Sequence, residues 1–364
     1  MKRMAIYRNI YQLLQRVSLL SLLLCCVDCS KEYSNNNARH IAFEIANSDG
    51  WNEMVRGEEL NNTTLQTQGF GVFAYYTERG SWSASAATSP DFMNNTKVTS
   101  SDKGTSWQYS PIKYWPQDQR DRVSFFAYAP YIDGNDLNDT KIDFEVKTAV
   151  LDQIDLAWSN ASTINLTKET EKVIFTFKHA LARIGFTVTA KNDGEFPLRD
   201  GVKITIQQIT VGYGSGLYNK GTIDLHNAAD TPVWSDQSGE VEYSITAANF
   251  VYKLAGGFVL TKDNTASAQK LNGDDSYIMV IPQDFSTKKL NIYVKYKVEL
   301  SSGNDIYNEY VNENVGTVNV NLEAGNTYII NIITDLKKAE VDNSVNVTKW
   351  EDGGSVDFGG IVPN

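Results

Sequence analysis

The alternation of residue types between Ile292 and Leu300 constrains the fold of this chain more than any other feature. Apolar side chains occupy every second position, at Ile292, Val294, Tyr296, Val298 and Leu300, and charged ones stand between them at Lys295, Lys297 and Glu299. Successive side chains of a β-strand point to opposite faces, so the pattern predicts a strand with one buried face and one face in water.

Similar short patterns, with almost no helical periodicity, continue from His40 onward. The predicted strands are Ile41–Ala46, Phe70–Thr77, Val123–Ala129, Ile142–Val146, Val202–Val211, Tyr277–Ile281 and a strand whose Tyr328, Ile330, Ile332 and Leu336 face inward. Glycine, asparagine and aspartate separate them, as in Asp133-Gly134-Asn135. The 19 tyrosines and 15 phenylalanines also favour strands. We therefore predict an all-β protein built from β-sandwiches.

A change of register near residue 180 predicts the division between two domains. The bulky residues of Val173-Ile174-Phe175-Thr176-Phe177 stand mainly at odd positions, whereas those of Ile184-Gly185-Phe186-Thr187-Val188 stand at even positions. A strand that kept its register would turn one set to the wrong face of its sheet. The change indicates a bulge, or a strand that leaves one sheet and enters another. We predict domains at 40–180 and 181–364; the alternative is one long bulged strand within a single domain.

The first residues have the pattern of an export signal. Lys2, Arg3, Arg8 and Arg16 precede a short apolar run, and all three cysteines follow it within five positions. We interpret 1–28 as a lipoprotein signal peptide, Cys29 as the acylated residue, and 29–39 as a polar tether to the outer membrane. Cys25 and Cys26 are the alternatives for lipidation.

The sequence offers little support for catalysis or cofactor binding. Its three histidines are scattered, and no cysteine follows Cys29, so we predict no catalytic residues, no metal site and no cofactor. The glycine-rich stretch at 212–216 lacks the lysine of a phosphate loop and predicts a turn. We expect His179 to act as a cap or to form a hydrogen bond at the domain junction. The net charge of −11 argues against a nucleic-acid partner.

Several stretches resemble the fimbrillin family, the lipoprotein precursors of type V pili. They are Trp107-Gln108-Tyr109-Ser110-Pro111-Ile112-Lys113-Tyr114-Trp115-Pro116, Val123–Pro130, Phe175–Ile184, Ile281-Pro282-Gln283 and Gly325-Asn326-Thr327-Tyr328. The resemblance implies two tandem transthyretin-like Greek-key β-sandwich domains and no enzymatic activity. It implies a stalk, tip or anchor subunit of a fimbrium that supports cell adhesion at the cell surface. The implied partners are other pilus subunits, the outer membrane before maturation, and a host or bacterial surface ligand.

The resemblance also implies a route of assembly: proteolysis after an arginine or lysine removes the first strand, and a neighbouring subunit donates a C-terminal strand in its place. Here the removable strand would present Ile41, Phe43 and Ile45. Arg56 is the expected cleavage site, with Arg39 as the alternative. The donor would present Val356, Phe358 and Val362, whereas Val341–Trp350 is either the alternative donor or the last strand of the body.

A second hypothesis is a surface glycan-binding lipoprotein with β-sandwich domains. Exposed indoles at Trp51, Trp82 or Trp107 would then serve as stacking platforms for sugar rings. A hydrolase that uses paired carboxylates is a third and weaker hypothesis.

Overall fold

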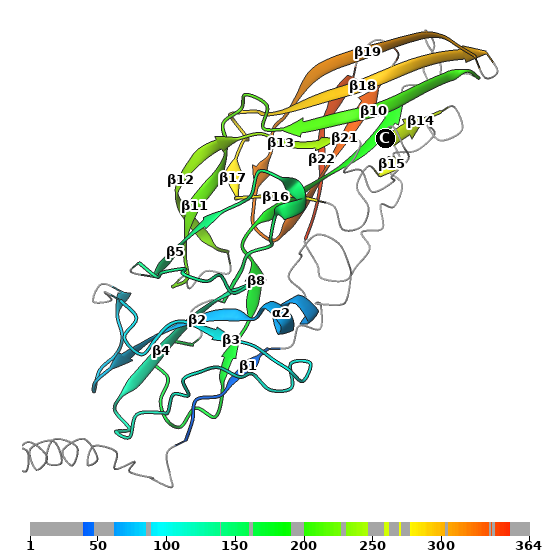
Figure 1. Ribbon diagram of the computed structural model, residues 1–364. Helices are drawn as coiled ribbons and strands as arrows, with labels where there is room; N and C mark the ends of the chain where they lie inside the picture. The colour runs from blue at the N-terminus through cyan, green and yellow to red at the C-terminus, as the bar shows by residue number, and fades with distance from the viewer. Residues whose placement is uncertain are drawn as a thin grey trace, which may run out of the picture. The chain divides into compact units, whose positions relative to one another are not determined.

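The computed structural model describes residues 39–46, 62–84, 89–138, 140–159, 163–190, 200–226, 231–246, 258–261, 269–270, 277–302, 305–334, 336 and 339–349. The chain divides into two units, Met1–Arg39 and His40–Asn364, and the architecture below belongs to the second. Strands dominate it (Figure 1), which confirms the all-β prediction. Its described helices are the short α2 (Asn62–Gln68) and the 3-10 turn η2 (Val150–Asp152), and none of them is long and apolar enough to cross a membrane.

Two sheets contain most of the strands from the first half of the chain. One has the order β3-β2-β4-β6-β8, with spans Met93–Val98, Phe70–Thr77, Arg122–Ala129, Ala157–Ser159 and Phe177–His179. The other consists of β1 (Phe43–Ile45) and β7 (Val173–Phe175), which are parallel. Both sheets contribute to one apolar cluster, which we call the N-terminal core and which includes Ile41, Phe43, Phe70, Phe125 and Phe175.

The second half forms two large sheets, and both contribute to a second apolar cluster, which also includes Phe73 of β2 and Phe126 of β4. One has the order β13-β10-β18-β19, with spans Tyr243–Thr246, Val202–Val211, Leu290–Ser302 and Asp305–Val318, and β14 (Phe258–Leu260) also pairs with β10. The other has the order β15-β9-β21-β22, with spans Gln269–Lys270, Ala182–Ala190, Asn326–Thr334 and Ala339–Lys349, and β16 (Ile278–Val280) also pairs with β9. The predicted alternation from Ile292 to Leu300 matches the buried face of β18 as far as Val298, but it is wrong at the last two positions, where Glu299 is buried and Leu300 is half-buried.

Two smaller sheets complete the described part of the fold. β17 (Gln283–Asp284) pairs with β20 (Asn321–Leu322). β12 (Val233–Val241), β11 (Leu217–Asp224) and β5 (Lys141–Glu145) form the other in that order. Strand β5 precedes the predicted domain boundary and β11 follows it, so this sheet takes strands from both predicted halves. The boundary near residue 180 and the transthyretin-like detail remain predictions.

The register change near residue 180 coincides with the passage from one sheet to another. Strand β8 ends at His179, and β9 begins at Ala182 in a different sheet. The odd-numbered Val173, Phe175 and Phe177 lie in the N-terminal core, and the even-numbered Ile184, Phe186 and Val188 lie in the second core. At the passage, Nδ1 of the buried His179 lies 2.6 Å from Oδ2 of Asp155, which is the hydrogen bond expected there.

Candidate functional site

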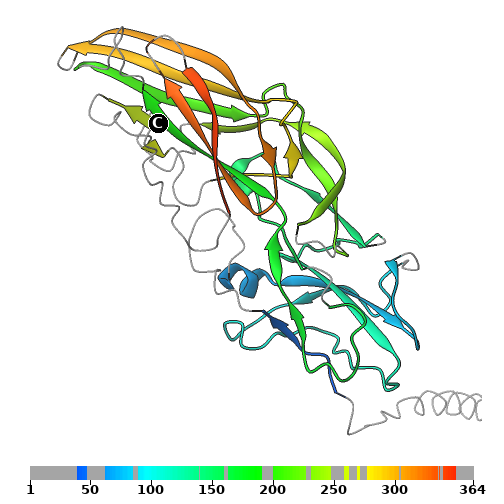
Figure 2. The ribbon, with the colours of Figure 1, turned by 180° about the vertical axis from the view of Figure 1, so that it is seen from behind.

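The segment from His40 to Ala46, which contains β1, is held by backbone hydrogen bonds on both sides. On one side it runs parallel to β7, and Figure 2 shows β1 in dark blue beside the green β7. The amide of Val173 donates to the carbonyl oxygen of Ala42 at 2.8 Å, and the amide of Ala46 donates to Phe175 at the same distance. We call the space that this segment fills the β1 slot.

The opposite wall of the β1 slot is formed by residues of the 107–116 motif. The amide of Ile41 donates to the carbonyl oxygen of Lys113 at 2.9 Å, and His40 forms an antiparallel bridge with Tyr114. The hydroxyl group of Tyr109 donates to the carbonyl oxygen of Ile41 at 2.8 Å. Burial raises the pKa of Tyr109. The segment is therefore bonded to β7 along β1, and on its other side its first residues, His40 and Ile41, are bonded to the motif.

The inward side chains of this segment fill an aromatic cavity of the N-terminal core. Ile41 is fully buried, Phe43 is 4% exposed, and Ile45 is half-buried. The ring of Phe43 lies within 6.3 Å of four other rings, measured between centroids: Phe70, Tyr109, Phe125 and Phe175. Burying one such large apolar side chain stabilises a fold by about 1.5–3 kcal/mol. Loss of the segment would therefore expose apolar surface as well as unpaired backbone groups.

The outward side of the segment is held more weakly. Oε2 of Glu44 lies 2.6 Å from Nζ of Lys172, and both side chains are close to half exposed. Exposed ion pairs add little to stability because water and salt screen them. The segment is therefore held in the β1 slot mainly by its buried side chains and its backbone hydrogen bonds.

The predicted site residues fall into two groups. The structure brings Ile41, Phe43 and Ile45 together in the β1 slot, with the exposed Arg39 directly before it. Cys29, Arg56, Val356, Phe358 and Val362, with the alternatives Cys25 and Cys26, lie outside the described residues. Residues 341–349 of the alternative donor belong to β22, which pairs with β21 at the edge of its sheet.

Sequence reasoning missed the parts played by Tyr109 and Lys113. Both belong to the 107–116 motif that carries the family resemblance, and that motif was the signal from which they could have been found. The hydroxyl group of Tyr109 bonds to Ile41, 68 positions away. No local sequence pattern marks a hydrogen bond over such a separation, so the motif alone could not identify Ile41 as the acceptor.

The indoles proposed as sugar platforms do not form an exposed row among the described residues. Trp82 is half-buried between Tyr75 and Phe126, and Trp107 is half-buried edge-on against Phe70. Trp51 lies outside the described residues.

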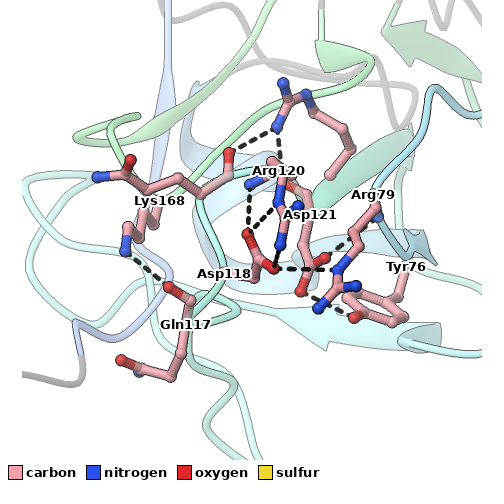
Figure 3. A network of polar contacts seen from close by, with 9 residues as sticks. Tyr76, Arg79, Gln117, Asp118, Arg120, Asp121 and Lys168 are labelled. Atoms are coloured by element: carbon pink, nitrogen blue, oxygen red, sulfur yellow. Dashed lines mark hydrogen bonds and ion pairs between the residues drawn. The ribbon is translucent and has the colours of Figure 1, made fainter.

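A second polar cluster joins the end of β2 to the turn before β4 (Figure 3). Asp118 accepts a hydrogen bond from Arg120 at 2.8 Å and one from Arg79 at 3.2 Å. The bond with Arg120 is the main reason why the pKa of Asp118 lies far below 3.8. Nearby, the hydroxyl group of Tyr76 donates to the buried Asp121 at 2.8 Å, which raises the pKa of Tyr76. Protein donors occupy both carboxylates, so the cluster connects two loops rather than offering free ligands.

Three comparisons with known proteins agree with this fold. The fimbrillin-like family model matches residues 59–350. A curated relative, fimbrium subunit Fim1C of Phocaeicola vulgatus, is 27% identical over 391 aligned positions that cover 96% of this chain and 99% of the relative. The crystal structure of a fimbrial protein from Bacteroides vulgatus superposes with a TM-score of 0.67 at 23% identity, covering 86% of this chain and 99% of that chain. Because the family model spans most of its length, the chain belongs to the fimbrillin-like family.

Proposed function

We propose that this chain is a subunit of a type V fimbria that is exported as a lipoprotein and assembles by exchange of its first strand. The observation that carries the proposal is the β1 slot. Its occupant is hydrogen-bonded on both sides and buries Ile41 and Phe43, yet it stands at the N-terminal end of the folded unit. One cut downstream of the segment would separate it from the body. The names of the relatives, a fimbrium subunit and a fimbrial protein, support the same role.

The two candidate cleavage sites have opposite consequences for the β1 slot. Arg39 precedes the segment, so a cut there would free the body from residues 1–39 and leave the slot filled. Arg56 lies between β1 and α2, so a cut there would detach the segment together with everything before it. Only the second cut creates an acceptor for another strand. We therefore assign assembly to cleavage after Arg56.

The C-terminal residues have a spacing that suits the slot. Val356 and Phe358 repeat the two-residue separation of Ile41 and Phe43, with a β-branched residue before an aromatic one. An incoming strand with this spacing would supply a ring at the position of Phe43 and backbone groups for Lys113, Val173 and Tyr109. We propose that the donated strand comes from a neighbouring subunit, and that the polymer serves adhesion at the cell surface.

The first test is chemical analysis of the chain on the surface of cells that express it. We expect an acylated Cys29 in the precursor and an N-terminus at Gly57 in the assembled form. Arg56→Gln should block polymers that resist mild denaturation, whereas Arg39→Gln should leave them intact. Polymer formation by Arg56→Gln at the level of the unaltered chain would contradict the assignment of the cut.

Substitutions in the C-terminal residues test the proposed donor strand. Phe358→Asp should abolish polymers because it places a charge in an apolar cavity. Ile361→Asp is the matched control and should polymerise, because a donated β-strand would turn position 361 to the face opposite Phe358. A cleaved chain that stays monomeric in its unaltered form would overturn assembly by strand exchange.

A further inference from the structure

The surface around the β1 slot carries large apolar side chains that the fold leaves in water. Ile112 and Tyr114 stand on one side of the segment and are 49% and 52% exposed. Ile174, on the other side, is 47% exposed. Clustered exposed apolar residues mark interaction sites more often than scattered ones do.

Tyr114 and Ile174 share one face. Tyr114 is the bridge partner of His40, and Ile174 pairs in register with Glu44, so both point to the outward side of the segment. Ile112 lies beside the same segment, where it lines a hollow of about 310 Å³ with His40, Ile41 and Ala42 and with residues 107–109. The apolar side chains therefore flank the slot on both sides of the strand that fills it. We call Ile112, Tyr114 and Ile174 the flanking patch.

The length of the tail limits how far away a donor subunit can lie. Strand β22 ends at Lys349, and residues 350–355 separate it from Val356. Even when fully extended, this connection spans only about 25 Å. A subunit that places Val356 in the slot of its neighbour must therefore hold the end of its β22 within about 25 Å of that slot, a distance that reaches the flanking patch. Val347, two residues before that end, is itself 51% exposed.

We propose that the flanking patch is a contact surface for a second copy of this chain, the copy whose tail fills the slot, and that it meets the region around Val347 of that copy. This inference rests on the proposed function. The two surfaces are unlike each other, so the contact is head-to-tail and repeats along an open filament. Two neighbouring subunits are then joined by the donated strand and also by a contact between their folded parts.

Introduced cysteines test the contact directly. All natural cysteines precede Arg56, so the processed chain contains none of its own. Processed Ile112→Cys chain is mixed with processed Val347→Cys chain, allowed to polymerise, and oxidised. We expect a disulfide-linked dimer of the two variants. The control pairs Val347→Cys with Val233→Cys, on β12, whose valine is 50% exposed, and should give no such dimer.

Charged variants supply the second readout. Ile112→Glu and Ile174→Glu should fold as the unaltered chain does but form at least about tenfold less polymer, because assembly would bury a charge. Val233→Glu should polymerise normally. Normal polymer from both patch variants overturns the patch while strand exchange stands. If the charged patch variants polymerise poorly but the cysteine variants form no disulfide, the region around Val347 is not the one that the patch contacts. Failure of the unaltered processed chain to polymerise refutes the proposed function, and the patch with it.

Discussion

The hydroxyl group of Tyr109 donates a 2.8 Å hydrogen bond to the backbone carbonyl oxygen of Ile41. The bond joins the 107–116 motif to the first strand of the folded unit, 68 positions earlier. The motif that carries the family resemblance therefore forms one wall of the β1 slot.

Replacing Tyr109 tests how much its hydrogen bond contributes to the free energy of unfolding. Tyr109→Phe removes the donor and keeps the ring, so we expect the free energy of unfolding to fall by about 1 kcal/mol. Urea denaturation of the unprocessed chain measures the change. Tyr131→Phe is the control, because its hydroxyl group bonds to Asp133 in an exposed turn, and it should change stability by less than about 0.5 kcal/mol. Equal effects of the two substitutions would argue against a special contribution from Tyr109.

The buried face of the first strand should matter more than its outward neighbours. Phe43→Ala leaves a cavity among four rings, and we expect a loss of about 3–5 kcal/mol in the free energy of unfolding. Ile174→Ala, at an exposed position of β7, should cost less than about 0.5 kcal/mol. Denaturant unfolding compares the two. A cost below about 1 kcal/mol for Phe43→Ala would mean that the slot does not hold the ring as described.

Alkaline pH should destabilise the fold through Tyr128. Burial raises the pKa of its hydroxyl group to about 12, against 10.0 for an ordinary tyrosine. Below pH 10 both the folded and unfolded chains keep the proton, so no pH effect arises. Between pH 10 and 12 only the unfolded chain releases it, and stability falls by about 2–3 kcal/mol. Tyr128→Phe should remove this part of the fall in unfolding experiments over that range, and an unchanged slope would contradict the assignment.

Acid pH should weaken the cluster around Asp118. Its pKa is lowered in the folded chain, chiefly by the hydrogen bond from Arg120, so its contribution is complete well above 3.8 and is lost as pH falls below that value. Asp118→Asn removes the titrating group. The variant should lose less stability than the unaltered chain between pH 5 and the acid limit of the experiment. The contribution is small because the cluster is exposed to solvent. Parallel pH curves for the two proteins would show that Asp118 does not titrate as described.

Some of the strands predicted from the sequence have the bounds that the structure shows. The predicted Phe70–Thr77 and Val202–Val211 have the same bounds as β2 and β10. The change of parity between Phe177 and Ile184 marks the passage between sheets because burial on the wrong face is costly in any context. The short α2, in which Leu65 is buried, has too little apolar periodicity to be found from sequence.

The pairing of the strands could not be predicted from the sequence, for a different reason. Nothing in Phe43–Ile45 indicates that it pairs in parallel with Val173–Phe175, and nothing in Lys141–Glu145 indicates that it joins Leu217–Asp224. Pairing over such separations depends on which edges are left available once the rest of the sheet has formed. Periodicity describes one face of one strand and carries no information about its neighbour.

The two-sided bonding of the segment 40–46 has a mechanical consequence. Its hydrogen bonds to Lys113 on one side and to Val173 and Phe175 on the other lie across the strand axis. A force pulling along that axis loads these bonds together in shear, whereas a force that peels the strand sideways would break them one after another. Any strand that fills this slot end to end would resist tension along its length far better than it would resist peeling.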